Sequence, residues 1–402
     1  MARQPDGDVP PQDGSLPPAA RAAWGDRPFG IYVHVPFCAT RCGYCDFNTY
    51  TAAELAGAVT VDRTSYHDVL RAELSLARRV LGDRDVPVST VFVGGGTPTL
   101  LGPQALLAVL DGIRDTFGLL PGAEVTVEAN PDSVAPESLA ALREGGVTRV
   151  SFGMQSAVPH VLAVLDRTHT PGGAHRAVGW ARDAGFDRIS LDLIYGTPGE
   201  SMADWEQSLD AVLAAGVGHV SAYALIVEPG TRMAAAIRRG AVSPPDDDLM
   251  ADMYERVDER LGAAGLPWYE LSNWALPGQE CRHNLGYWRG DDWWGIGPGA
   301  HSHVGGVRWW NAKHPAAHAA HLAGGRSPAV GREVLDAATR KVEDLMLAIR
   351  MADGIALAGL VPAQREVLAA AAARGLGTVG AGRFVLTRSG RLVADALVRD
   401  LI

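Results

Sequence analysis

The sequence has few cysteines, an excess of acidic over basic residues, and no long apolar run. Four cysteines among 402 residues are too sparse for a disulfide-stabilised fold, and clustered thiols suit a reducing compartment. The formal net charge of −10 gives no electrostatic support for nucleic-acid binding. The apolar runs are short and interrupted by glycine or charge, which predicts no transmembrane helix. We therefore expect a cytoplasmic protein with at most peripheral membrane contact and no nucleic-acid partner.

The first 28 residues differ in composition from the rest of the chain. They are rich in proline, aspartate, glycine and alanine, and they lack both hydrophobic periodicity and the apolar core of a secretory signal. This pattern predicts a disordered leader over residues 1–28. The whole chain is 47% hydrophobic and 20% charged, which is enough for a large core and about two or three domains.

Short apolar runs alternate with stretches of helical periodicity over residues 29–235. Helical spacing recurs between the runs, as from Tyr66 to Leu81. The alternation predicts parallel βαβ units, which build either a partial (β/α)6 barrel or a doubly wound α/β sheet. The predicted strands are Ile31–Val35, Thr90–Val93, Glu124–Ala129, Arg149–Gly153, Arg188–Ile194 and His219–Ile226.

Polar residues follow the carboxyl ends of these strands, and this favours the barrel. Cys38 follows the first strand, a Gly-Gly-Gly segment from Gly94 the second, and Gln155 the fourth. Glu128 and Asp192 lie near the ends of the third and fifth strands. Parallel barrels build their sites at this end. We therefore expect these side chains to meet.

The pattern changes after residue 235. Residues 236–337 read as an extension of the barrel with a glycine- and tryptophan-rich stretch. Residues 338–402 contain a helix over Lys341–Met351, a second helix within 354–375 and a strand over Arg383–Thr387. This order predicts a C-terminal helical, winged-helix-like domain. The acidic balance favours a packing or lid role over DNA binding.

Three of the four cysteines, Cys38, Cys42 and Cys45, lie within eight residues. A structural zinc site or a ferredoxin cluster needs four protein ligands. Three thiolates can hold three irons of a four-iron cluster and leave the fourth iron open to a small molecule. Zinc bound with a histidine such as His34 is the alternative, although Cys-x3-Cys-x2-Cys is not among the usual zinc spacings.

This spacing, with the aromatic Tyr44 before the last cysteine, resembles the radical S-adenosylmethionine (SAM) superfamily. The resemblance implies that SAM occupies the open iron of a [4Fe–4S] cluster. It also implies that an electron from the cluster breaks a carbon–sulfur bond to give a 5′-deoxyadenosyl radical. The glycines from Gly94 to Gly96 allow close backbone approach. They fit a tight turn alone, but beside the cysteines they resemble the segment that holds the methionyl amino group.

Charged residues in the apolar strands are the next candidates. A buried carboxylate such as Glu128 is costly unless it is paired, and its alternative role is to cap the helix after Pro131. Asp192 lies inside a strongly apolar strand. The planar fork of Arg167 suits a carboxylate, and its alternative is a surface ion pair with Asp166 or Asp187.

Longer motifs resemble the family of oxygen-independent coproporphyrinogen III dehydrogenases and related haem chaperones. They are Tyr32–Cys38, the cysteine motif, Gly94–Thr99, Phe152–Ser156 and Asp192–Gly199, and the resemblance runs from about residue 29 nearly to the C-terminus. It implies cluster ligands Cys38, Cys42 and Cys45. The SAM contacts that it implies are Tyr32, Tyr44, Gly95, Gly96, Thr97, Glu128, Gln155, Arg167, Asp192 and Ala224.

Two features favour the chaperone branch of this family. The dehydrogenases follow the third cysteine with another as Cys-x-Cys, where this chain has Phe47. The segment His283-Asn284-Leu285-Gly286-Tyr287-Trp288 resembles a haem-binding motif. It implies haem contacts from His283, Asn284, Tyr287 and Trp288. Neutral imidazole is a common axial ligand of haem iron, and aromatic rings pack on a porphyrin face. His283 could instead hold a loop by hydrogen bonds, and Cys281 is a competing ligand.

The resemblance therefore implies a haem chaperone that binds haem, a [4Fe–4S] cluster and SAM. Its partners would be acceptor haemoproteins and an electron donor. The alternative is a true enzyme, an oxygen-independent coproporphyrinogen III dehydrogenase that decarboxylates two propionates. His314, His318 and His321 share a predicted helix face, which we expect to be solvated because no acid is nearby in the sequence.

Overall fold

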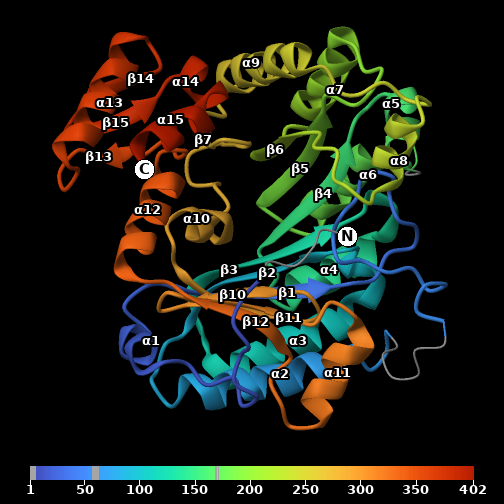
Figure 1. The fold of residues 1–402 in the computed structure, drawn as a ribbon. Coiled ribbons are helices and arrows are strands. Elements are labelled where there is room, and N and C mark those ends of the chain that lie inside the picture. Colours follow the sequence, from blue (N-terminus) through green and yellow to red (C-terminus); the bar gives the residue numbers. More distant parts are fainter. Residues whose placement is uncertain (1–5, 57–62, 168–169, 171) are drawn as a thin grey trace.

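The computed structural model describes residues 6–56, 63–167, 170 and 172–402. Its described residues form a 12-stranded sheet with the order β12-β11-β10-β9-β1-β2-β3-β4-β5-β6-β8-β7 (Figure 1). Strands β1 to β6 are parallel and adjacent in chain order. In a doubly wound sheet the strand order reverses at a switch point. The uninterrupted order found here therefore confirms the partial barrel. The six strands are β1 (Phe29–Val35), β2 (Val88–Gly95), β3 (Leu119–Ala129), β4 (Arg149–Gln155), β5 (Arg188–Tyr195) and β6 (His219–Ala224).

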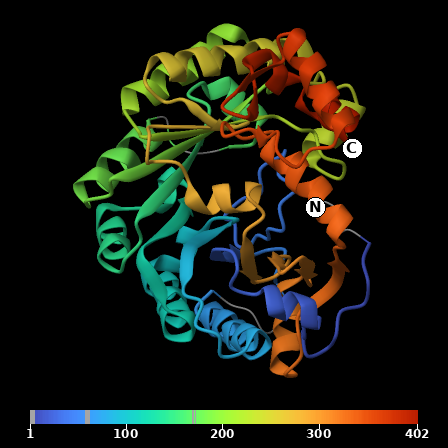
Figure 2. The same cartoon turned by 90° about the vertical axis from the view of Figure 1, so that its left-hand side faces the viewer.

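Helices cover the outer, convex side of this curved sheet (Figure 2). The expected apolar stripe of the first of them is present, because Tyr66, Leu70, Leu74 and Leu81 are all buried. Strand β1 is buried along nearly its whole length, as expected for parallel strands covered on both faces. The outer helices are α2 (Tyr66–Leu81), α3 (Gly102–Phe117), α4 (Pro136–Glu144), α5 (Pro159–Val164), α6 (Gly173–Asp183), α7 (Met202–Ala215) and α9 (Asp247–Ala263).

The extension closes both edges of the parallel sheet. Strand β9 (Asp292–Ile296) pairs in parallel with β1 and leads into the antiparallel strands β10 (His301–Val304), β11 (Val307–Asn311) and β12 (Ala329–Val334). At the other edge, β8 (Asn273–Ala275) pairs with β6 and β7 (Trp268–Glu270). Helix α10 (Arg282–Trp288) lies on the concave side, near β2 (Figures 1 and 2).

Residues 6–28 are folded onto the sheet. They contain α1 (Pro18–Ala23), and Asp8 forms an antiparallel bridge with Arg332. Leu16, Ala20 and Trp24 are buried. The prediction of a disordered leader is therefore wrong for this part, and residues 1–5 lie outside the described residues. Ala20 lies in α1, Leu16 precedes the helix and Trp24 follows its last residue, so the proline-rich composition concealed a short segment with three buried apolar side chains.

The C-terminal part has its own core, centred on Ile349, Leu368 and Phe384. Its antiparallel sheet has the order β13-β15-β14, and helix α14 begins at Arg388, just after the last of these strands in the chain. Arg391 joins this part to α9 by two hydrogen bonds to Asp258. The elements are α12 (Ala337–Ala348), β13 (Ile355–Ala356), α13 (Pro362–Ala373), β14 (Gly377–Gly380), β15 (Arg383–Leu386), α14 (Arg388–Leu392) and α15 (Ala394–Leu401).

Two shorter helices complete the fold around the barrel mouth and the extension. They are α8 (Arg232–Arg238) and α11 (Pro315–Ala323). In the part of the chain that the structure describes, no helix combines the length and apolar character needed to cross a membrane.

Candidate functional site

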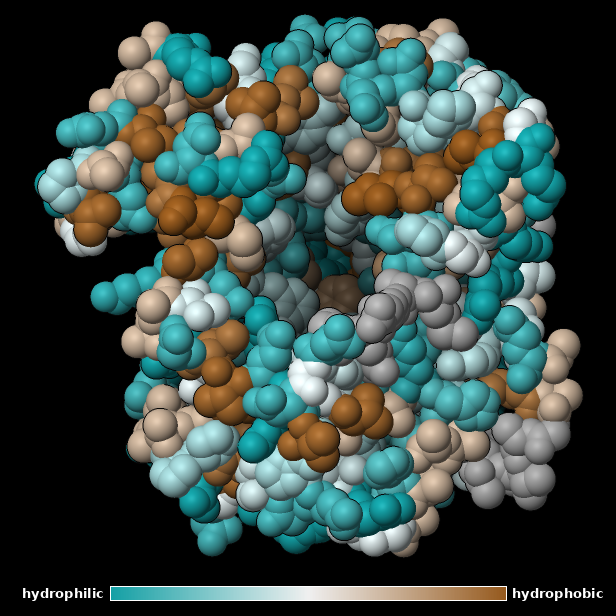
Figure 3. All heavy atoms as spheres, in the orientation of Figure 1, coloured by the Kyte–Doolittle hydropathy of each residue, from teal (hydrophilic) through white to brown (hydrophobic). Residues whose placement is uncertain are grey.

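A cavity of about 550 Å³ lies on the concave side of the barrel, and it is visible as a hollow in Figure 3. This volume falls in the range of ligand pockets, roughly 300–1,000 Å³. Of the predicted cluster, SAM and haem residues, all except Trp288 line this cavity. The structure thus brings together residues from positions 32 to 287, and their roles in ligand binding stay predictions.

The cysteine loop and the glycine segment are packed tightly against each other. The Thr97 N–H donates to the Phe37 carbonyl at 2.7 Å, and the Cys38 N–H donates to the Tyr50 carbonyl at 3.0 Å. A Cβ atom on Gly96 would lie 2.5 Å from the Phe37 carbonyl oxygen and 3.0 Å from Cys38 Sγ. Any larger residue at position 96 would therefore displace the loop that carries the thiols.

The donor set of this loop fits an iron–sulfur cluster. Cys38, Cys42 and Cys45 are free thiols that line the cavity. Burial raises the pKa of the Cys45 thiol to about 11, so its thiolate forms only beside strong positive charge, such as iron supplies. Arg167 Nη1 lies 3.7 Å from Cys42 Sγ.

The geometry does not favour the zinc alternative. Among the described residues, no group of three Cys, His, Asp or Glu side chains is arranged to hold a single metal ion. Both ring nitrogens of His34 are already hydrogen-bonded, Nδ1 to the Tyr32 hydroxyl at 3.0 Å and Nε2 to the Asn48 carbonyl at 2.9 Å. In a cluster, by contrast, each thiolate binds its own iron.

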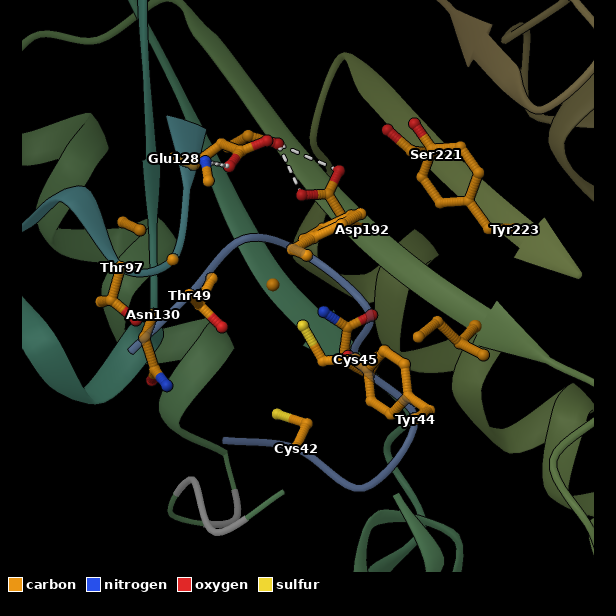
Figure 4. A pocket seen from close by; sticks show the side chains of 18 of the residues that line it. Cys42, Tyr44, Cys45, Thr49, Thr97, Glu128, Asn130, Asp192, Ser221 and Tyr223 are labelled. Atoms are coloured by element: carbon orange, nitrogen blue, oxygen red, sulfur yellow. Dashed lines mark hydrogen bonds between the residues drawn. The ribbon is translucent and has the colours of Figure 1, made fainter. Parts of the chain in front are cut away.

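Two carboxylates face the cysteines across the cavity (Figure 4). Glu128 Oε2 accepts a hydrogen bond from the Gly95 N–H at 3.2 Å, and Asp192 accepts from the Ser151 hydroxyl at 2.9 and 3.0 Å. Burial, with the charge of Asp192 second, raises the pKa of Glu128 to about 8. Burial also raises the pKa of Asp192. The pair is thus suited to a cationic group, which would favour ionisation.

The helix-capping alternative for Glu128 is wrong. The short 3₁₀ turn η2 (Pro131–Ser133) is capped by Asn130, whose side chain accepts a hydrogen bond from the Asp132 N–H at 3.0 Å. The Glu128 carboxylate instead accepts from Gly95 and lines the cavity.

Gln155 and Arg167 lie at the mouth of the cavity beside the end of β4. Gln155 has a φ of 65°, a region that non-glycine residues rarely adopt outside sites that require it. Arg167 Nη2 donates to the Gly153 carbonyl at 2.8 Å. The proposed surface pair of Arg167 with Asp166 is absent from the described contacts, because Asp166 lies 3.2 Å from Arg232 instead.

His283, on α10, is held by side chains on three sides. Its Nδ1 is 2.8 Å from the Thr90 hydroxyl and its Nε2 is 2.9 Å from the Tyr287 hydroxyl. The ring stacks on Phe92 with centroids 5.4 Å apart. Burial lowers the pKa of His283 to about 3, so the imidazole is neutral at physiological pH. Both ring nitrogens are engaged, as the loop-holding alternative requires.

Trp288 is the predicted site residue that the structure leaves out of the cavity. His283 and Tyr287 are four positions apart on α10 and therefore lie on one face of the helix. Trp288 follows at about 100° further round the axis, and it is half-buried outside the cavity. Its predicted packing on haem is not supported by this arrangement.

Sequence reasoning missed polar residues deeper in the cavity. Two of them lie two positions before a predicted acid on the same strand, and alternate residues of a strand share a face. Ser190 precedes Asp192 by two positions, and Thr126 precedes Glu128 by two. This period-two pattern of polar residues inside apolar strands was the available signal. The missed lining residues on strands are Thr126, Arg149, Ser151, Ser190, His219, Ser221 and Asn273.

The expectation of a solvated histidine face on α11 is wrong for His318. This side chain is buried, and its Nε2 lies 2.8 Å from Glu73 Oε2 on α2. Glu73 also accepts hydrogen bonds from the Asn311 side chain and the Gly297 N–H, both at 2.7 Å. The sequence around His318 offers no acidic partner, and Glu73, which pairs with it, lies 245 residues away in the chain.

Comparisons with known proteins agree with this geometry. Residues 32–212 match the radical SAM superfamily. The chain is 56% identical over 377 residues to a Mycobacterium tuberculosis protein named "Heme chaperone HemW", covering 94% of this chain and 95% of that protein. It is 38% identical over 283 residues to a Bacillus subtilis protein of the same name, covering 70% of this chain and 72% of the relative.

A solved structure shares the fold. It is the radical SAM enzyme coproporphyrinogen III oxidase (HemN) from Escherichia coli, with a TM-score of 0.79 and 23% identity, covering 95% of this chain and 92% of the other. At this identity the likeness shows the fold alone. The sequence relatives go further, and with the superfamily match they show that the chain belongs to the HemW family of radical SAM proteins.

Proposed function

We propose that this protein is a haem chaperone that carries a [4Fe–4S] cluster and SAM and passes haem to acceptor haemoproteins. The observation that carries the proposal is the 56% identity, along 94% of the chain, to a protein named haem chaperone HemW. The cavity supports it, because one space contacts both the cysteine loop and helix α10. An external electron donor to the cluster completes the proposed set of partners.

Membership of the radical SAM superfamily implies the cluster and SAM. Cys38, Cys42 and Cys45 would hold the cluster, which when bound supplies the electron for SAM cleavage. Glu128 would accept hydrogen bonds from the ammonium or ribose hydroxyls of SAM, and Arg167 would bind its carboxylate. The glycine segment would let the backbone lie against the methionyl end.

His283 would be the haem ligand. If its Nδ1–H donates to the Thr90 hydroxyl, Nε2 has the free lone pair that iron requires. The Tyr287 hydroxyl now occupies that lone pair, so rotation of the Tyr287 side chain would expose the nitrogen. Cys281 is a poorer ligand, because burial raises the pKa of its thiol to about 12 and the thiol lies 3.6 Å from Glu124 Oε1.

A haem titration of the cluster-reconstituted protein tests the proposal, with His283→Ala and Cys281→Ser as matched variants of the same segment. We expect His283→Ala to weaken haem binding by at least about tenfold, since even the loss of a supporting partner costs roughly 10–100-fold in metal affinity. Cys281→Ser should bind as the unaltered protein does. An unchanged absorption spectrum and affinity in His283→Ala would remove His283 from the proposal.

The second candidate is oxygen-independent coproporphyrinogen III dehydrogenase, which the shared fold with HemN favours. Incubation with SAM, reductant and coproporphyrinogen III separates the two functions. We expect no protoporphyrinogen. The dehydrogenase branch of the resembling family carries a further cysteine two positions after the third one. This chain has Phe47 there, which lines the cavity and has 61% of its surface accessible. Protoporphyrinogen in good yield would overturn the chaperone proposal.

A further inference from the structure

The deep end of the cavity contains a buried arginine with unused hydrogen-bonding capacity. Arg149, the first residue of β4, has only 1% of its side chain exposed and lines the cavity. Its Nη2 donates to the Gln279 carbonyl. Its Nη1 has no hydrogen-bond partner among the residues that the structure describes. An unpaired guanidinium N–H at such depth is costly unless a ligand satisfies it.

Arg149 shares the Glu124 carboxylate with a second arginine. Glu124 Oε2 lies 3.6 Å from Arg149 Nε and 3.7 Å from Arg188 Nη1, so one carboxylate faces two guanidinium groups. The neighbouring histidine adds no charge, because burial and then Arg149 lower the pKa of His219 well below its usual value. Arg149 is thus a buried cation in a place of low dielectric, where an anion is bound strongly.

Neutral hydrogen-bonding groups surround the same space. The Ser190 hydroxyl is 2.7 Å from His219 Nδ1, and the Asn284 amide donates to Glu270 at 3.0 Å. Both side chains line the cavity with Arg149. Arginine and carboxylate groups frequently form two parallel hydrogen bonds, and hydroxyl and amide groups in the same cavity can add further ones.

Glu124 connects this arginine to the proposed haem ligand. Its Oε1 accepts a hydrogen bond from the His283 N–H at 3.1 Å, while its Oε2 faces Arg149. The start of α10 and the guanidinium thus lie on either side of one carboxylate. A planar ligand coordinated at His283 would extend its edge within the same cavity.

We propose that Arg149 binds a propionate carboxylate of the tetrapyrrole and so fixes its orientation in the cavity. The inference rests on the proposed function, since it takes haem as the ligand. It adds a specificity contact to the iron–imidazole bond: a tetrapyrrole with free carboxylates is bound, and one with masked carboxylates is discriminated against.

The test compares haem with haem dimethyl ester, in which both propionates are neutral. Each is titrated into the full-length, cluster-reconstituted protein, and the ratio of the two dissociation constants is measured. We expect the ester to bind about tenfold more weakly or worse, as for loss of a charge-assisted hydrogen bond. In Arg149→Gln the ratio should fall to about one.

Arg188→Gln is the matched control. It removes the other guanidinium that faces Glu124, but Arg188 is not among the cavity-lining residues, so the ratio should stay as in the unaltered protein. SAM affinity is measured in parallel, and Arg149→Gln should leave it unchanged. If Arg149→Gln does not fold, Arg149→Lys, which keeps the charge, should retain part of the discrimination.

The outcomes separate this inference from the proposed function. Equal affinity for haem and its ester in the unaltered protein would overturn the carboxylate contact while haem binding stands. Unchanged discrimination in Arg149→Gln, or a loss of SAM affinity instead, would assign the carboxylate contact elsewhere. Absence of haem binding in the unaltered protein would overturn the proposed function itself.

Discussion

The two ends of the cavity differ in charge. At the cysteine end, defined by Cys38, Cys42, Cys45, Glu128 and Asp192, the protein supplies thiols and two buried carboxylates. At the arginine end, defined by Arg149, His219, Cys281 and His283, the buried Arg149 guanidinium has an Nη1 without a hydrogen-bond partner among the described residues. The first end suits cationic ligand groups and the second suits anionic ones. We therefore expect cationic groups of the ligands to bind at the cysteine end and anionic groups at the arginine end.

The histidines sharpen this difference because they stay uncharged. Burial lowers the pKa of His283 to about 3 and that of His219 well below its usual value. A protonated imidazole beside Arg149 would add a second positive charge there. A neutral ring instead keeps one nitrogen as an acceptor, and in His283 this is the nitrogen that the proposed haem iron would need once the Tyr287 hydroxyl moves away.

The largest expected effect is on bound iron, and it should separate the thiols of the cysteine end from the thiol of the arginine end. Changing Cys38, Cys42 and Cys45 together to alanine should reduce cluster iron to background, because it removes all three proposed ligands and the described residues offer no group of three side chains arranged to hold a metal ion instead. Cys281→Ala should keep all of the iron. Iron per chain and the EPR signal after dithionite reduction measure both. Iron retained in the triple variant would place the cluster elsewhere.

The next effect concerns SAM. Glu128→Gln removes the carboxyl group that would ionise beside bound SAM while keeping the size of the side chain, and we expect SAM to bind roughly tenfold to 100-fold more weakly. Haem affinity should change by less than about twofold, since independent sites rarely couple. Equilibrium dialysis with SAM and a haem titration give the two constants. Equal weakening of both ligands would contradict the separation of the two ends.

The order of the strands and the cysteine end were predictable because their signals are local. Six apolar runs separated by helical periodicity give parallel βαβ units, and β1 to β6 lie in that order. The motifs at the strand ends are contiguous in sequence, so Cys38 to Cys45 and Gly94 to Gly96 could be recognised directly. Their convergence follows from the topology, since carboxyl ends of parallel strands share one edge.

The arginine end was not predictable from motifs because its residues are scattered. Arg149 is the first residue of a largely apolar predicted strand. Its partner Glu124 is the first residue of the preceding predicted strand, 25 residues earlier in the chain. Only the register Thr126↔Arg149 shows that these faces meet. The Glu73–His318 pair was missed for the same reason, because 245 residues separate its members.

The smallest predicted effect is on stability and concerns Glu128 again. Its pKa is near 4.5 without burial and about 8 in the folded protein. The folded state therefore holds more protons than the unfolded state between these values, and stability falls as pH rises through this window. In Glu128→Gln this loss should disappear. Without SAM, we expect the variant to be more stable at pH 9 by up to about 5 kcal/mol, or a few degrees in Tm.

Thermal unfolding from pH 5 to pH 9 measures this difference between variant and unaltered protein. Glu54 provides the control, because hydrogen bonds from Thr51 hold the pKa of Glu54 below its usual value despite partial burial. Its stabilising effect is complete above pH 5, so the difference curve for Glu54→Gln should be flat. A flat curve for Glu128→Gln would mean that this carboxylate is already paired with positive charge before SAM binds. The acidic character of the cysteine end would then be lost, and with it the contrast with the arginine end.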